Sequence, residues 1–209
     1  MSNSTISRRK FLGTTAVATT VSLVPFNYSF AIGSKKPNSK VNGVQLGLTT
    51  YSYRAISHSL PEVLEYVLKA GVNALEMRSV LEEGLGIPAG PARAPRGAQL
   101  SDQEKAERAK AADAAREEQR KWRLSLPMQK YADVRKIYND AGVNMHIAKF
   151  APSSWSDEEI DYAYRAAKVL GAYGITDEAS EAACKRLGKF AEKHNSLALY
   201  HTHGQFGEP

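Results

Sequence analysis

From Val44 onward, short apolar runs alternate with longer stretches in which apolar residues recur at helical spacing. Each apolar run follows a joint of glycine or asparagine, residues that suit the left-handed conformation that closes a helix. Residues 70–73 and 141–144 carry the same joint, Ala-Gly-Val-Asn. The pattern predicts strands near residues 45–50, 73–78, 144–150, 173–178 and 196–203.

The starts of the intervening helices carry their own signals. Three of them show the capping box, in which a serine oxygen and a glutamate satisfy free backbone N–H groups. These pairs are Ser59 with Glu62, Ser101 with Glu104, and Ser156 with Glu159. Pro127 marks a further start, since proline fits the first turn of a helix. We expect helices near residues 60–70, 102–122, 127–141, 157–170 and 181–194.

Regular alternation of strand and helix predicts an α/β fold with a parallel sheet, either doubly wound or closed into a barrel. A dinucleotide-binding fold would place a glycine-rich phosphate loop directly after the first strand. Residues 47–53 read Gly-Leu-Thr-Thr-Tyr-Ser-Tyr instead. The aromatic and hydroxyl side chains at this point argue against a dinucleotide fold.

The N-terminus is expected to be an export address. Residues 7–13, Ser-Arg-Arg-Lys-Phe-Leu-Gly, resemble the twin-arginine signal, and a threonine- and alanine-rich apolar stretch follows. Ser-Phe-Ala at 29–31 offers a cleavage site. We predict a signal peptide over residues 1–31, a polar linker over 32–43, and a protein that is periplasmic or otherwise exported. The alternative is a retained anchor, although the apolar stretch is shorter than the ~20 residues that span a bilayer.

Residues 82–122 interrupt the alternation and are expected to be an insertion. The first half is rich in glycine, proline and alanine and predicts a loop. The second half is an Ala/Glu/Lys/Arg helix with little apolar face, which favours a solvated helix over a binding surface.

Charge and cysteine content limit the classes of partner. The chain has 28 basic and 22 acidic residues, and three basic residues but no acidic one lie in the leader. The remainder is therefore close to neutral, and its charges are interspersed, which argues against nucleic-acid binding. Cys184 is the single cysteine, so no internal disulfide can form and the core or a ligand must stabilise the fold.

Six stretches, taken in order, resemble the sugar phosphate isomerase/epimerase family with its xylose isomerase-like TIM barrel, and most closely its exported members with a twin-arginine leader. The matching stretches are residues 47–54, 74–77, 121–128, 156–163, 174–178 and 200–203. The resemblance implies that residues 44–209 form an incomplete barrel with about five of its eight β/α units. It also implies that this chain is C-terminally truncated. Whether such a fragment is active alone stays open, because the family's later strands supply further metal ligands.

The resemblance directs attention to the carboxyl ends of the strands, where barrel enzymes place their reacting groups. His201 and His203 are two residues apart on a predicted strand, so both point to the same side. The resemblance makes Glu178 a metal ligand, with His203 as its partner and His201 as a ligand or substrate contact. Imidazole and carboxylate together suit a divalent metal such as Mn, Co, Mg or Zn. Asp177 should point the other way.

Three more residues are candidate substrate contacts. Lys149, at the end of the third strand, is suited to an oxyanion or hydroxyl group. Glu76 could contact a sugar hydroxyl or form a structural ion pair. Tyr53 could line the sugar site or pack in an aromatic core.

The implied reaction is metal-dependent isomerisation or epimerisation of a sugar or sugar phosphate. A proton moves beside a carbonyl, carried by Glu178 or His201, while the metal holds two substrate oxygens. The alternatives are a lyase or hydratase acting on keto-glycosides and a non-catalytic sugar-binding remnant. The expected partner is a small sugar or sugar derivative, with no nucleic acid and no stable membrane span after cleavage. The sequence leaves open whether the protein forms a homo-oligomer.

Overall fold

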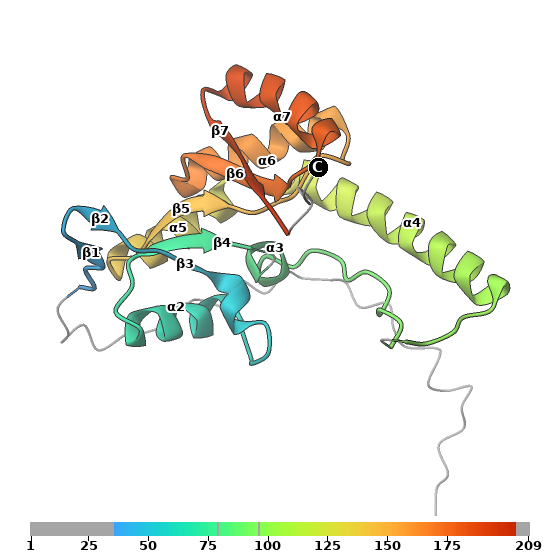
Figure 1. Ribbon diagram of the computed structural model, residues 1–209, viewed down its shortest axis with the longest axis horizontal. Coiled ribbons are helices and arrows are strands. Elements are labelled where there is room, and N and C mark those ends of the chain that lie inside the picture. The colour runs from blue at the N-terminus through green and yellow to red at the C-terminus, as the bar shows by residue number, and fades with distance from the viewer. Residues whose placement is uncertain (1–35, 79, 96, 204–209) are drawn as a thin grey trace, which may run out of the picture. The chain divides into compact units, whose positions relative to one another are not determined.

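The computed structural model describes residues 36–78, 80–95 and 97–203 (Figure 1). The predicted signal peptide at 1–31 and the first residues of the predicted linker lie outside the described residues. Among the described residues, no helix is both long and apolar enough to cross a membrane.

The centre of the fold is a parallel sheet of five strands in which spatial order equals chain order. The strands are β3 (Leu48–Thr49), β4 (Ala74–Met77), β5 (Asn144–Ala148), β6 (Gly174–Glu178) and β7 (Leu197–His201). A doubly wound sheet reverses its strand order at a switch point, whereas successive strands of an α/β barrel stay adjacent. The order seen here contains no reversal, so the mixed α/β fold is compatible with part of an α/β barrel.

Helices connect the strands, and most begin and end where the sequence predicts. They are α2 (Leu60–Lys69), α3 (Val80–Gly84), α4 (Asp102–Ser125), α5 (Gln129–Asp140), α6 (Asp157–Leu170) and α7 (Glu181–His194). All three predicted capping boxes are present. Positive φ angles at Gly71, Gly142, Gly171 and Asn195 confirm the predicted joints.

One face of the sheet packs on these helices. Leu75, Met77 and Ile175 point to that side and are fully buried. Helix α5 packs on α6, and α6 on α7. Across the face, the Tyr138 hydroxyl donates to the Leu60 carbonyl at 2.6 Å, which ties α5 to α2. Burial of the apolar faces of these helices is the main stabilising contribution to the fold.

Among the elements that were not predicted are a 3₁₀ helix and a short α-helix. The 3₁₀ helix η1 (Thr50–Tyr53) follows β3 directly. Helix α3 occupies the place where the insertion was expected to begin as a loop. That expectation was wrong for residues 82–84, because burial of Val80 and Leu81 holds this turn of the chain against the core.

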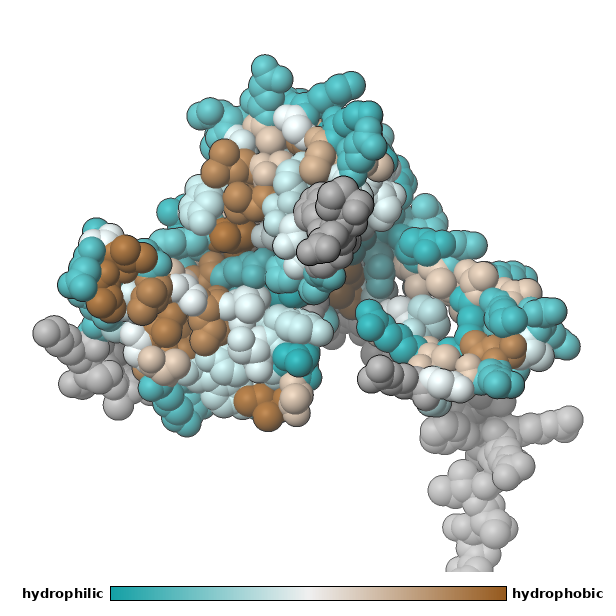
Figure 2. Space-filling view, viewed as in Figure 1, coloured by the Kyte–Doolittle hydropathy of each residue, from teal (hydrophilic) through white to brown (hydrophobic). Residues whose placement is uncertain are grey.

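The end of the predicted linker also belongs to the fold. Strands β1 (Lys40–Val41) and β2 (Val44–Gln45) form a hairpin around Asn42 and Gly43, which have φ angles of 49° and 84°. An Asn-Gly pair adopts such angles readily and favours a two-residue hairpin turn. Figure 2 shows hydrophobic residues gathered over this hairpin, where Val41 and Val44 are more than half exposed.

Candidate functional site

A polar cluster lies at the carboxyl ends of β5, β6 and β7. Lys149, directly after β5, donates from Nζ to Oε1 of Glu178, the last residue of β6. The other oxygen of that carboxylate, Oε2, lies 3.1 Å from Nε2 of His203. Glu178 pairs in register with His201, whose ring centroid is 4.4 Å from that of His203. The structure thus brings together four of the six predicted site residues.

The cluster is buried at one end and open at the other. The Lys149 side chain is only 4% exposed, whereas that of Glu178 is 47% exposed and that of His203 is 64% exposed. A ligand that arrives from solvent would therefore meet the Glu178 and His203 end of the cluster first.

The electrostatics of the cluster keep Glu178 ionised. The hydrogen bond from the Lys149 ammonium lowers the pKa of the Glu178 carboxyl below its ordinary value. The charges of Lys149, His203 and His201 act in the same direction, and partial desolvation opposes them. Glu178 is therefore a carboxylate throughout the neutral range.

The loop that carries Lys149, residues 149–156, is held from several sides. Asp177 points away from the cluster, as expected, and accepts a hydrogen bond from the Ser153 backbone N–H at 2.7 Å. Arg186 of α7 donates to the carbonyls of Ser153 and Trp155. Within the loop, Ala151 has a φ of 52°, a conformation that costs a residue with a side chain about 1–2 kcal/mol. Strain of this kind persists where surrounding contacts impose it, and it clusters at functional sites.

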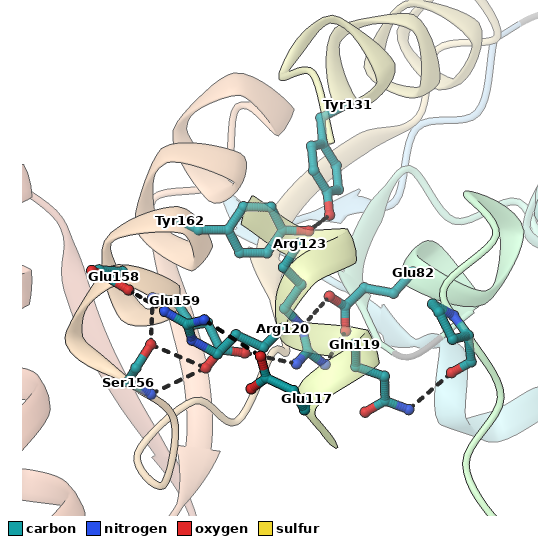
Figure 3. A network of polar contacts seen from close by, with 11 residues as sticks. Glu82, Glu117, Gln119, Arg120, Arg123, Tyr131, Ser156, Glu158, Glu159 and Tyr162 are labelled. Atoms are coloured by element: carbon teal, nitrogen blue, oxygen red, sulfur yellow. Dashed lines mark hydrogen bonds and ion pairs between the residues drawn. The ribbon is translucent and has the colours of Figure 1, made fainter. Parts of the chain in front are cut away.

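A buried ionic network fixes the insertion near the same edge (Figure 3). Arg123 of α4 donates from Nε to Glu82 of α3 at 2.9 Å and from Nη1 to Glu159 of α6 at 3.1 Å. Its guanidinium also lies over the Trp155 ring, 3.6 Å from the ring centroid. Next to this network, Tyr131 and Tyr162 share a hydrogen bond between their hydroxyl groups. The network joins α4 to both α3 and α6.

Glu76 lies away from this cluster. It pairs in register with Thr49 and Ile147, and Ile147 pairs with Gly174. Glu178 is four residues farther along β6, a distance of about 13 Å at the strand rise of roughly 3.3 Å per residue. Glu76 instead lines a pocket of about 450 Å³ on the second face of the sheet, together with His146 and Tyr173.

Tyr53 is likewise engaged elsewhere. Its ring centroid is 5.1 Å from that of Tyr66 in α2, and burial raises the pKa of its hydroxyl. This is the aromatic packing that the sequence left open as an alternative. A substrate contact by Tyr53 remains a prediction.

Two arginines near β3 and β4 were missed. Arg54 and Arg78 each place their guanidinium carbon 4.3 Å from the centroid of the Tyr51 ring. The one available signal was position, since Arg78 directly follows the apolar strand that ends at Met77.

A metal would find part of a coordination sphere here. Oε2 of Glu178 and Nε2 of His203 are close enough to share a cation, with the His201 ring beside them. Oε1 of Glu178 is taken by Lys149. Within the described ranges, no group of three or more His, Cys, Asp or Glu side chains converges as a metal site would require. The donor set fits a divalent metal in kind, and it supplies fewer than the three protein ligands usual for a catalytic zinc.

Comparison with known proteins assigns no family to the chain. No family model and no curated protein matches the chain. One similar solved structure is an uncharacterized protein from Parabacteroides distasonis ATCC 8503, with 16% sequence identity and a TM-score of 0.48. The match covers 78% of this chain and 55% of that one, so the chain spans about half the length of that protein.

Proposed function

We propose that the five β/α units belong to a TIM barrel of the xylose isomerase-like type, and that the protein is an exported, metal-dependent sugar isomerase or epimerase. The observation that carries the proposal is the cluster of Lys149, Glu178, His201 and His203 at the carboxyl ends of three adjacent parallel strands. Barrel enzymes place their chemistry at this edge. The sequence resemblance supplies the reaction class.

The cluster suits proton transfer beside a carbonyl. Lys149 orients Glu178 and keeps it ionised, and its ammonium is a positive charge fixed in a buried position. Such a preorganised charge stabilises the oxyanion that forms when a carbon next to a carbonyl loses its proton. A divalent metal held by Glu178 and His203 would polarise the substrate oxygens.

Two residues are candidates for moving the proton. A carboxylate whose pKa is lowered by a lysine is a weak base, which argues against Glu178 in this role. Imidazole titrates near neutral pH and can both accept and return a proton. His201, paired in register with Glu178, is therefore the better proton carrier, and Glu178 acts mainly by binding and orientation.

The test is deuterium exchange in D₂O followed by NMR. The full chain is incubated with aldoses, ketoses and their phosphates in the presence of Mn, Co, Mg or Zn. Isomerisation or epimerisation with deuterium entering at the carbon beside the carbonyl is the expected result. His201→Gln should abolish exchange, while His194→Gln, on α7 and ion-paired with Asp161, should leave it unchanged. Exchange that survives Glu178→Gln, or no exchange with any metal, contradicts the proposal. A product of different mass would instead indicate the lyase or hydratase chemistry.

A further inference from the structure

Two positive charges share one aromatic ring at the edge of the sheet where the cluster also lies. Tyr51 is 48% exposed, and the guanidinium carbons of Arg54 and Arg78 both lie 4.3 Å from its ring centroid. The two carbons are therefore no farther apart than twice that distance. Like charges at such a separation repel, and a cation–π contact at an exposed ring returns only about 0.5–1 kcal/mol per cation.

No described carboxylate compensates these charges. Neither Arg54 nor Arg78 forms an ion pair with a described acidic side chain; Arg54 donates only to the Tyr51 carbonyl, at 3.2 Å. The arrangement contrasts with Arg123, which meets two glutamates. A guanidinium held over an aromatic ring has five N–H donors, and apart from the bond to the Tyr51 carbonyl no protein acceptor is recorded for the side chains of these two arginines among the described residues. An anion is the ligand these groups fit.

The pair lies at the same edge of the sheet as the lysine–glutamate cluster. Tyr51 and Arg54 belong to the turn after β3, and Arg78 follows β4. The Arg78 backbone N–H donates to the Thr50 hydroxyl at 3.0 Å, which joins the two strand ends. On the other side of β4, the Lys149 backbone N–H donates to the Met77 carbonyl at 2.7 Å. Arg78 is thus one strand from Lys149 and two strands, roughly 10 Å, from the strand of Glu178.

We propose that Tyr51, Arg54 and Arg78 form an anion subsite that binds the phosphoryl or carboxylate group of the substrate. The idea rests on the proposed function, in that the substrate's carbonyl end would then reach Lys149 and Glu178. The planar fork of arginine binds both oxyanions through paired hydrogen bonds. The substrate is accordingly a sugar phosphate or a sugar acid rather than a neutral sugar.

Direct binding tests the subsite without any turnover. Isothermal titration of the metal-free full chain, at fixed ionic strength, uses inorganic phosphate, a pentose phosphate, a hexuronate and a neutral pentose as probes. We expect binding of the anionic probes and none of the neutral pentose. The relative affinities of phosphate and hexuronate distinguish a phosphoryl from a carboxylate group. Loss of one charged hydrogen-bonding partner should weaken binding about tenfold or more.

Matched variants distinguish anion binding at a specific site from nonspecific electrostatic attraction to a protein with a net positive charge. Arg78→Gln should show that loss, and Arg54→Lys, which keeps the charge but removes the fork, should show a smaller one. Arg165→Gln, an exposed position on α6, changes net charge by the same amount and should leave binding within about twofold. Equal weakening in Arg78→Gln and Arg165→Gln, or no anion binding by the unaltered chain, overturns the subsite. Circular dichroism identifies any variant that fails to fold, and Arg54→Lys is then the deciding variant.

Failure of the subsite and failure of the proposed reaction give different experimental results. Anion binding without deuterium exchange refutes the proposed reaction and leaves the subsite intact. If deuterium exchange occurs on neutral sugars and is no faster on sugars that carry a phosphate or carboxylate, the subsite is refuted and the proposed reaction still stands.

Discussion

Replacing Arg123 with methionine tests how the insertion is held to the fold. The Arg123 side chain is 8% exposed, and those of its partners Glu82 and Glu159 are 13% and 7% exposed. Methionine keeps an unbranched aliphatic side chain but is shorter and carries no charge, so the variant leaves the largely buried carboxylates of Glu82 and Glu159 without a cation. Breaking a buried ion pair by removing one partner costs about 3–5 kcal/mol. Loss of the guanidinium also removes its contact with the Trp155 ring.

The assay is urea unfolding followed by far-ultraviolet circular dichroism, with Arg120→Met as the control. Arg120 lies one turn earlier on α4 and pairs with Glu158 at 2.6 Å, but these side chains are 35% and 67% exposed. Such a surface pair contributes about 0–1 kcal/mol. The two variants lose one positive charge each on the same helix, so their difference measures burial rather than net charge.

A triple variant isolates the cause. Adding Glu82→Gln and Glu159→Gln to Arg123→Met removes both buried charges, and glutamine still completes a capping box. Much of the lost stability should return, because a neutral amide costs less to bury than a carboxylate that has lost its cation. The reasoning is refuted if Arg123→Met costs no more than Arg120→Met, or if the triple variant is no more stable than Arg123→Met alone.

The remaining predictions concern three single positions, Glu178, Gly174 and Gly188. The carboxyl of Glu178, followed by carbon-13 NMR, should titrate below the usual pKa of a glutamate, and Lys149→Met should move that pKa upward; an unchanged value would show that the lysine is not responsible. Because this folded-state pKa is lowered, the ion pair should stabilise the fold above the ordinary pKa of glutamate and cease to do so as the pH falls through the folded-state pKa. Gly174→Ala should destabilise the fold by about 1–3 kcal/mol in thermal unfolding, since its new Cβ would lie 2.6 Å from the Leu197 carbonyl oxygen. Gly188→Ala, within α7 and with open space around it, should instead stabilise by roughly 0.5–1 kcal/mol, and equal effects at the two glycines would contradict the close approach of β6 and β7.

The order of helices and strands was predictable because its signals are local. A capping box such as Ser156 with Glu159 spans four residues, and the left-handed joint at Gly171 needs only one. The hairpin at Asn42 and Gly43 also had a local signal, but the polar composition around it favoured a linker. Its attachment is not local: Ser39 bonds through its hydroxyl to Asn73, 34 residues away.

The sequence predicted the position of a site residue correctly only where that residue lies at the end of a strand and strand order alone determines its neighbours. Glu178 ends β6, Lys149 directly follows β5, and His203 lies two residues beyond the end of β7, which stops at His201 rather than at the predicted residue 203. Because these strands are adjacent and parallel, the meeting of the three residues follows from strand order. Glu76 was expected at the same edge, but its strand is offset from β6 by register, which no single sequence reveals. The partners of Arg123 are 41 and 36 residues away, and the sharing of Tyr51 by two arginines depends on the path of the turn after β3.

The position of Trp155 has a spectroscopic consequence. The chain contains two tryptophans, Trp122 on α4 and Trp155 in the loop before α6. Trp122 directly precedes Arg123, and the other indole lies under that guanidinium. Intrinsic emission excited at the indole band therefore reports on the contact between Arg123 and Trp155. A red shift that occurs while the far-ultraviolet circular dichroism is unchanged would signal that α4 has separated before the fold is lost. The protein carries its own optical reporter for movement of the insertion, with no label required.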